Sequence, residues 1–465
     1  MKVVVGKSRC YPDEAEELPD YSGSTARMNM YAYICPTPGK YTDTSGTHQI
    51  EDQRTVENFQ KYKDCGFDTL MLLGNDKYEG EDFETSDLKK TLDMAQEVGL
   101  KVIVFDNRLY TLSEKKEPIL DTEFGTDKTL VEYVRECMAP YMDHPAFYGV
   151  SLVDEPYYNQ FIALSQVIKA VRTVDSNIYT HKVLHPYAHW MTQGDYSGNG
   201  STAEGTAADY ASYITNYLAM SGDNYVSYDN YPFMQEEQGG LWSRYYENMQ
   251  IAVKNAALYN APVTLTIQSF GQKPGKSFRE VEEDDIRFQG YSALGLGVKN
   301  LLYYTYYMFP NNGTAGCTQA IVDHDGRNIL YNEVRRVNRE LHKLAKVMLH
   351  FDYVKANFSY PSSMAQPKMF ENVENDILDG ATVVSQTQAT FVSQMYDEEN
   401  KRTGYMVMNA SDTAENKSNT VSVKFDNYLY ATIYVKGVPQ TVSLRNQVLE
   451  LTLESGEGIF VIPHN

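Results

Sequence analysis

Short apolar runs alternate with longer amphipathic stretches from residue 28 to about residue 350. The runs end near Gly, Pro, Asp or Asn and recur roughly every 30–45 residues, the spacing of strand–helix–strand units. They predict eight strands, at 28–35, 68–74, 101–106, 147–154, 178–184, 225–231, 263–270 and 300–307. Most are followed by an amphipathic stretch with apolar residues at helical spacing, such as the one that begins after Ser86 and ends at Gly99. Eight such units predict a parallel (β/α)8 barrel.

The pattern changes after residue 350. Helical stripes give way to short, nearly alternating segments separated by turn clusters, at 389–396, 404–409, 420–425, 431–436, 440–444, 448–453 and 458–463. Short strands at this spacing are typical of an antiparallel β-sandwich. We therefore expect a lead-in over 1–27, a barrel over 28–350 and a β-sandwich over 351–465.

The charge balance narrows the choice of partners. The chain of 465 residues carries a formal net charge of −21. Binding to nucleic acid or to anionic membranes requires Lys/Arg patches, so neither partner is expected. The N-terminal sequence turns polar after five residues and no apolar run is long enough to span a bilayer, which predicts a cytoplasmic protein without a signal peptide.

Neither cysteines nor histidines indicate a metal site. The five cysteines lack CxxC spacing, which argues against a zinc site or a disulfide framework. His181, His185 and His189 are spaced by four, but they follow a strand pattern and a proline, so they are not expected to converge. We expect no metal and no cofactor. The 38 tyrosines fit either ordinary packing or partly solvated clefts that bind sugar rings.

Glu155 is the leading candidate for catalysis. It follows the apolar run 147–153 and precedes Pro156, so it is expected at the carboxyl end of the fourth strand, where parallel barrels hold their active sites. Side-chain alternation would place Asp154 on the opposite face. Glycoside hydrolysis needs one carboxylic acid to protonate the leaving oxygen and a second carboxylate as nucleophile or base. A polar strand end is the simpler alternative.

Several segments resemble clan A glycoside hydrolases, in particular family 42 and β-galactosidase-like proteins. FYGVSLVDEP at 147–156 resembles their fourth strand, in which Asn-Glu-Pro carries the acid/base glutamate; this chain has Asp154 in place of the Asn. Further similar segments are VSYDNYP at 226–232, residues 301–307, IVDHDGR at 321–327, YNEVRRVNREL at 331–341 and ESGEGIFV at 454–461. The resemblance implies a barrel with Glu155 as acid/base.

The resemblance fails at strand seven. The family places its nucleophile glutamate at the end of this strand, where the chain offers Gln268. An amide is not a carboxylate nucleophile, although it can hydrogen-bond a sugar hydroxyl. Asp229, at the tip of strand six, is the leading second carboxylate; Asp106, Glu236 and Glu237 are weaker candidates.

Other residues near the predicted strand tips are expected to line the pocket. The predicted substrate-binding residues are Asp154, Gln268, Tyr228, Tyr231, His185, Asn107, Tyr306 and Trp242, with Asn75, Arg108 and Trp190 as further candidates. Exposed indoles on loops are suited to stacking on sugars.

The sequence thus predicts a glycosidase acting on small oligosaccharides or glycosides, β-galactosidase-like and acting at a chain end. Two alternatives stay open. The missing strand-seven glutamate fits a sugar-binding protein without activity, and the barrel also fits a lyase or isomerase acting on sugar acids.

Overall fold

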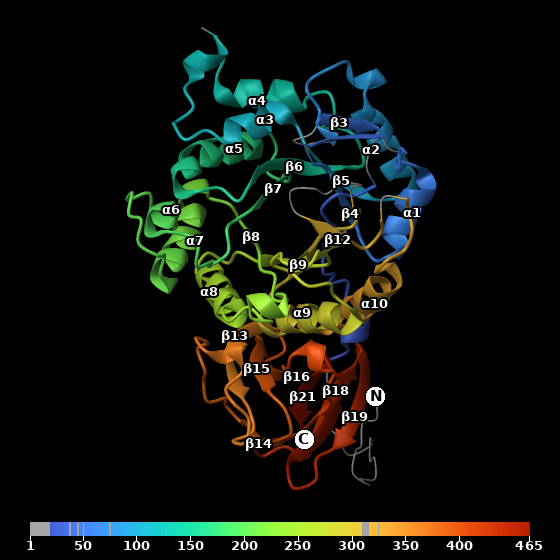
Figure 1. The fold of residues 1–465 in the computed structure, drawn as a ribbon, viewed down its shortest axis with the longest axis vertical. Helices are drawn as coiled ribbons and strands as arrows, with labels where there is room; N and C mark the ends of the chain where they lie inside the picture. The colour runs from blue at the N-terminus through green and yellow to red at the C-terminus, as the bar shows by residue number, and fades with distance from the viewer. Residues whose placement is uncertain are drawn as a thin grey trace.

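A computed structural model describes residues 19–36, 39–43, 46–49, 51–73, 76–125, 127–308, 316–323 and 325–465. Eight parallel strands form its central sheet, in the order β7-β6-β5-β4-β1-β11-β9-β8 (Figure 1). Their bounds are β1 Met30–Ala32, β4 Thr69–Met71, β5 Lys101–Val104, β6 Phe147–Asp154, β7 Tyr179–Val183, β8 Val226–Asp229, β9 Val263–Gln268 and β11 Asn300–Tyr304.

The sheet closes into a barrel between β7 and β8. Leu184 forms a parallel bridge with Tyr228, and its N–H donates to the carbonyl of Ser227 at 2.7 Å. All eight predicted strands are present, each within or close to its expected range. The predicted (β/α)8 barrel is therefore confirmed.

Helices surround the barrel on its outer face. Their bounds are α1 Val56–Asp64, α2 Asp87–Val98, α3 Asn107–Ser113, α4 Leu130–Met138, α5 Phe161–Val174, α6 Gln193–Ser197, α7 Ala207–Ser221, α8 Tyr245–Ala257, α9 Glu283–Gly295 and α10 Tyr331–Met348. As predicted, the Ser86 side chain accepts from the N–H of Lys89 at the start of α2, and Gly99 ends that helix in the left-handed conformation at φ 70°.

Tyrosines fill much of the barrel interior. Tyr31, Tyr33 and Val183 form a buried cluster with Met71, Ile103 and Leu302. The Tyr31 hydroxyl lies 3.1 Å from that of Tyr179 and 3.5 Å from Nδ1 of His181. Burial lowers the pKa of His181 to about 3, so this imidazole is neutral. The interior is thus an aromatic, polar-tipped core rather than an open channel.

A β-sandwich follows the barrel. A six-stranded antiparallel sheet has the order β13-β15-β16-β21-β18-β19, and a three-stranded sheet the order β14-β17-β20. The strands are β13 Asp352–Ser359, β14 Ala381–Gln386, β15 Thr390–Asp397, β16 Arg402–Asn409, β17 Asn419–Phe425, β18 Tyr430–Val435, β19 Val438–Ser443, β20 Val448–Leu453 and β21 Gly458–His464. The predicted sandwich is confirmed, although the sequence pattern did not predict β13 and β14. Two small antiparallel sheets also occur among the described residues: the hairpin of β2 Lys40–Asp43 with β3 Gly46–Gln49, and the pair β10 Gly271–Gln272 with β12 Cys317–Gln319.

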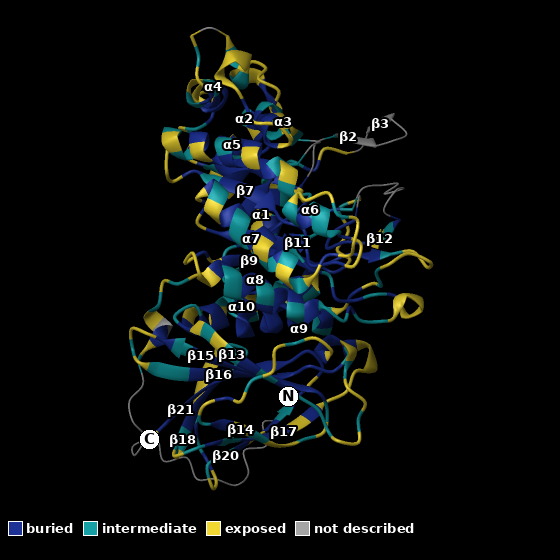
Figure 2. Cartoon of the chain, turned by 90° about the vertical axis from the view of Figure 1, so that its left-hand side faces the viewer, coloured by how far each residue is buried: buried dark blue, intermediate teal, exposed yellow. Residues whose placement is uncertain are grey.

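One apolar cluster spans the boundary between barrel and sandwich, and a second lies within the sandwich. Figure 1 shows α8, α9 and α10 between the two parts, and Figure 2 marks buried residues on both sides of the boundary. Phe391 of β15 stacks on Tyr246 of α8 with ring centroids 5.5 Å apart, and on Phe358 at 5.1 Å. The two parts therefore stabilise each other.

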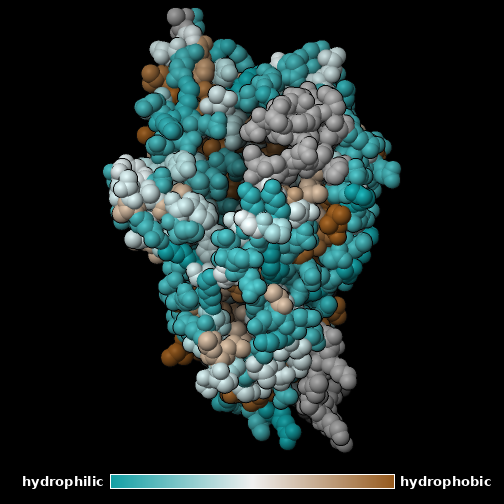
Figure 3. All heavy atoms as spheres, in the orientation of Figure 1, coloured by the Kyte–Doolittle hydropathy of each residue, from teal (hydrophilic) through white to brown (hydrophobic). Residues whose placement is uncertain are grey.

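The surface is strongly hydrophilic. Figure 3 shows polar side chains over most of the visible face, with apolar residues only scattered. Within the described part of the chain, no helix has both the length and the apolar character needed to cross a bilayer.

Candidate active site

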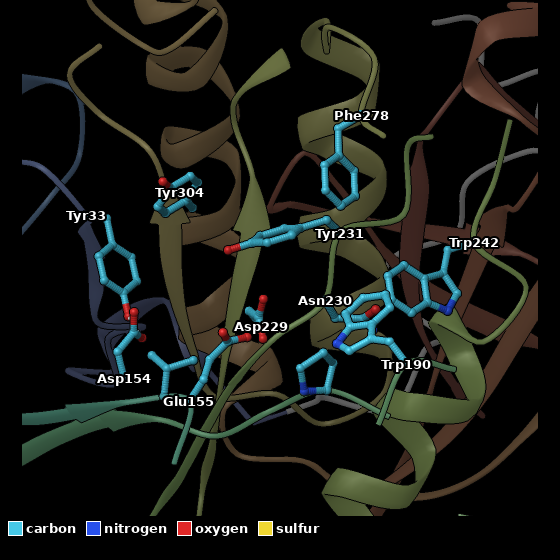
Figure 4. Close-up of a pocket in the computed structure, with 12 residues that line it drawn as sticks. Tyr33, Asp154, Glu155, Trp190, Asp229, Asn230, Tyr231, Trp242, Phe278 and Tyr304 are labelled. Carbon is cyan, nitrogen blue, oxygen red and sulfur yellow. The ribbon is translucent and has the colours of Figure 1, made fainter. Parts of the chain in front are cut away.

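A pocket with a cavity volume of about 320 Å³ lies at the carboxyl ends of the barrel strands (Figure 4). This is at the small end of the range for small-molecule sites, roughly 300–1,000 Å³. Three carboxyl groups, six aromatic rings and three other side chains line it: Asp154, Glu155, Asp229, Tyr33, Trp190, Tyr231, Trp242, Phe278, Tyr304, Val183, Pro186 and Asn230.

Glu155 reaches the pocket because its backbone leaves the strand geometry. Its φ is +46°, in the left-handed region, while its N–H still donates to the carbonyl of Val183 at 2.8 Å. Regular alternation would send neighbouring side chains to opposite faces. The expectation that Asp154 faces away from Glu155 is therefore wrong: both line the pocket. A non-glycine residue in this conformation is strained, and such strain concentrates at functional sites.

Asp229 ends β8 and points toward Glu155 in Figure 4. Its Oδ1 is buried and makes no hydrogen bond to the described residues. Burial, and next the charges of Glu155 and Asp154, raise the pKa of Asp229 well above its ordinary value. The raised pKa favours the protonated form of Asp229, which shares this acidic environment with Glu155 and Asp154.

Asp154 lies in the same pocket and remains accessible to water. The hydroxyl of Tyr33 donates to its Oδ1 at 2.9 Å. Desolvation, followed by the charge of Glu155, raises the pKa of Asp154 to about 6, against an ordinary 3.8. At pH 7 the group is mainly ionised.

His185 lies behind Glu155. Its Nδ1 is 3.5 Å from Oε1 of Glu155, and the imidazole is 7% exposed whereas the Glu155 side chain is 44% exposed. Neither ring nitrogen has a hydrogen-bond partner among the described residues. His185 was predicted to line the pocket; it does not line the cavity and contacts Glu155 instead.

Aromatic side chains form the remaining walls. Trp190 is 54% exposed and packs edge-to-face against Trp242, which is 9% exposed, with ring centroids 5.3 Å apart. Tyr231 packs against Phe278 and Tyr304 at 5.6 and 6.1 Å. Trp190, Trp242 and Tyr231, which the sequence predicted for the pocket, thus line it. Four further lining residues were not predicted: Tyr33, Asn230, Phe278 and Tyr304.

Gln268 does not line the pocket. It is the last residue of β9 and is fully buried. Its Oε1 accepts from the N–H of Phe233, and its Nε2 donates to the carbonyls of Phe233, Phe270 and Arg279 at 3.0–3.2 Å. The amide therefore holds together the loops that follow β8 and β9, and has no donor left for a ligand.

Three other predicted residues also lie away from the cavity. Tyr228 and Tyr306 are buried at 0% and 2% exposure on the outer side of the barrel sheet, where Tyr306 packs against Tyr62 at 4.8 Å. Alternation explains the error for Tyr228, because its neighbour Asp229 takes the inner face. Tyr306 lies beyond the end of β11 at Tyr304. Asn107 starts α3 and donates to Oε2 of Glu79 at 2.9 Å.

The weaker carboxylate candidates are also excluded from the pocket. Asp106 is buried, pairs with Arg108 at 2.6 Å and accepts from the hydroxyl of Tyr141 at 2.9 Å. Glu236 and Glu237 lie exposed in a short 3₁₀ turn. Asn75 lies outside the described residues. Where the structure describes the chain, no three His, Cys, Asp or Glu side chains are arranged to hold a metal ion.

The chain matches no protein-family model and no curated protein. Solved structures similar to it include a family 5 glycoside hydrolase from Bacteroides vulgatus, at 10% identity and TM-score 0.52 over 95% of this chain and 89% of that chain. An α-amylase from Anoxybacillus is similar at 11% identity and TM-score 0.51, over 96% and 99%. Identities this low establish the shared fold.

Proposed function

We propose that the protein is a glycoside hydrolase acting on small oligosaccharides or glycosides, with Glu155 as general acid/base and Asp229 as the second carboxylate. One observation carries the proposal: two carboxyls from the ends of strands β6 and β8 meet in one small pocket walled by aromatic rings. Glycoside hydrolysis requires such a pair, and rings of this kind bind the apolar faces of sugars.

The fold comparisons support this assignment. The similar solved structures include glycoside hydrolases that span nearly the same length. Fold alone does not determine activity, so the argument depends on the pocket. Its small volume favours one end of a sugar chain over the middle of a polymer. A β-galactosidase-like specificity, implied by the sequence resemblance, is part of the proposal.

The reaction divides between the two carboxyls. One donates its proton to the glycosidic oxygen as the bond to the anomeric carbon breaks; the other attacks that carbon, or activates a water that does so. The position of Glu155, accessible and beside His185, favours it as acid/base. The raised pKa of Asp229 instead favours Asp229 as the proton donor, so the azide products described below are needed to assign the two roles.

A panel of nitrophenyl glycosides, covering common sugars in both anomeric forms, tests the activity. We expect cleavage of at least one member, and proton NMR of the first-formed sugar then gives retention or inversion. For a retaining enzyme, azide can rescue either alanine variant, and the anomeric configuration of the glycosyl azide tells the two apart. Azide that replaces a missing nucleophile displaces the aryl group directly and gives the inverted azide, whereas azide that attacks the glycosyl-enzyme of an acid/base variant displaces the nucleophile carboxylate and gives the retained azide. An inverted azide from Asp229→Ala and a retained azide from Glu155→Ala would support the roles proposed.

Two outcomes would contradict the proposal. Sugar binding without cleavage of any glycoside would indicate a binding protein. An unsaturated product absorbing in the near ultraviolet would indicate a lyase. Among the described lining residues no Arg or Lys is present to hold a sugar acid, which argues against the lyase.

A further inference from the structure

The pocket has one carboxyl more than hydrolysis needs. Glu155 and Asp229 form the proposed pair, which leaves Asp154 without an assigned role. The three acids are lined up along one side of the cavity in Figure 4, and the described lining residues include no Arg, Lys or His. Charges in low-dielectric sites are normally paired, and the lining offers no cation to Asp154. His185 lies behind Glu155, with its Nδ1 3.5 Å from that carboxyl, and does not line the cavity.

Asp154 has hydrogen-bonding capacity left for a ligand. The hydroxyl of Tyr33, a residue that is only 5% exposed, donates to its Oδ1 at 2.9 Å and orients the carboxylate. A carboxylate can accept about four hydrogen bonds, and this is the one donor that the described residues direct at it. The side chain is accessible from the cavity. The rings of Tyr33, Tyr231 and Tyr304 line the same cavity, and aromatic faces stabilise cations as well as sugars.

We infer that the pocket selects sugars bearing a free amino group, with the carboxylate of Asp154 accepting hydrogen bonds from the ammonium. The inference rests on the proposed function and names its substrate class. An ammonium supplies three donors and the missing positive charge. Uronic acids and sugar phosphates are excluded, because they would add a negative charge to three carboxyls. N-acylated amino sugars are disfavoured because acylation removes the charge.

The test compares matched aryl glycosides that differ in one substituent. Each 2-amino-2-deoxy or 6-amino-6-deoxy glycoside is paired with its hydroxyl parent, its N-acetyl form and the corresponding uronide. A hydrogen bond to a charged group predicts that wild type prefers the amino sugar in kcat/KM by about tenfold to a hundredfold. The isosteric Asp154→Asn, in which the Tyr33 hydroxyl still has an acceptor, reduces this ratio by about tenfold or more. Glu237→Gln, an exposed carboxyl outside the pocket, leaves the ratio unchanged.

Binding separates failure of this inference from failure of the proposed function. Saturation-transfer NMR with free glucosamine, glucose and glucuronic acid reports selectivity even if no glycoside is cleaved. Preference for glucosamine that is lost in Asp154→Asn supports the ammonium site whether or not catalysis occurs. An equal or greater preference for the hydroxyl or acidic sugars, or a ratio that Asp154→Asn does not change, overturns it. A thermal melt confirms that the variant is folded.

Discussion

At the scale of single residues, the strained backbone of Glu155 determines that its carboxyl lines the pocket together with that of Asp154. A left-handed φ of +46° turns its carboxyl into the same cavity as Asp154, which a regular strand would not do. The conformation is unfavourable for any residue with a Cβ, so the position of this carboxyl in the cavity costs stability.

Replacing Glu155 by glycine and by alanine measures that strain. Glycine adopts positive φ without cost, whereas alanine pays about 1–2 kcal/mol. We expect Glu155→Gly to be more stable than Glu155→Ala by about 1 kcal/mol in urea unfolding. At Glu97, an exposed position in α2, the order reverses, because alanine is favoured within helices. Equal stabilities of the two Glu155 variants would show that no strain is stored there.

The pKa of Asp154 predicts a pH-dependent stability. Its pKa in the folded protein is about 6, above the ordinary 3.8, so between these values the folded state binds more protons than the unfolded state. This contribution to stability is therefore lost as pH rises through 6. Asp154→Asn is expected to melt at a higher temperature than wild type at pH 8, and the difference should shrink as pH falls below 6. Exposed Glu117→Gln should show no such trend. A gap that widened at low pH would contradict the assignment.

At the scale of elements, the sequence predicted the periodic features and missed the short ones. Eight apolar runs predict eight strands because buried parallel strands need continuous apolar residues. Helices α3 and α6 have only seven and five residues, too few to show a 3.6-residue period. Helix α4 was detectable from the capping box of Thr129 and Glu132 ahead of its buried Leu130, Val134 and Met138.

The positions of the predicted strand ends identify only some of the residues that line the pocket. Asp229 and Tyr231 are two residues apart and share the inner face, which alternation predicts. Phe278 and Trp190 come from loops, and their positions depend on loop conformations that no local pattern specifies. The role of Gln268 depends on three carbonyls that lie far from it in sequence or beyond its strand.

Placing a glutamate at the end of β9 tests the role of Gln268. In Gln268→Glu the buried side chain loses its donors to three carbonyls. We expect a loss of about 3–5 kcal/mol in unfolding free energy and no gain in activity. Gln238→Glu, in an exposed turn, serves as the control. Increased glycosidase activity in Gln268→Glu would instead place the end of β9 in the catalytic site.

At the scale of the whole molecule, the sandwich supports the barrel from the side of α8 and α9. Gly295, the last residue of α9, packs so closely that a Cβ there would lie 2.7 Å from the ring of Phe391. Arg279 pairs with Asp285 at 2.7 Å and also donates to Oγ1 of Thr413 in the sandwich at 3.1 Å. The active-site strands thus belong to the same packed unit as the sandwich.

Phe391→Ala tests this coupling. The ring is fully buried between Tyr246 and Phe358, so its removal leaves a cavity at the boundary of the two parts. We expect a destabilisation of about 3–5 kcal/mol, measured by urea unfolding followed through both tryptophan fluorescence and far-UV circular dichroism. Leu429→Ala, at a sandwich residue that is 58% exposed, should have little effect. A change below about 1 kcal/mol in Phe391→Ala would show that the two parts are independent.

The most direct test of the central claim is the turnover of the best aryl glycoside by Glu155→Gln, Asp229→Asn and the double variant. Residues that act as one catalytic unit have strongly non-additive effects. We predict that each single variant loses about 10²-fold or more in kcat, and that the double variant is within about tenfold of the slower single variant. Turnover close to that of wild type in either folded single variant would contradict the paired-carboxyl mechanism.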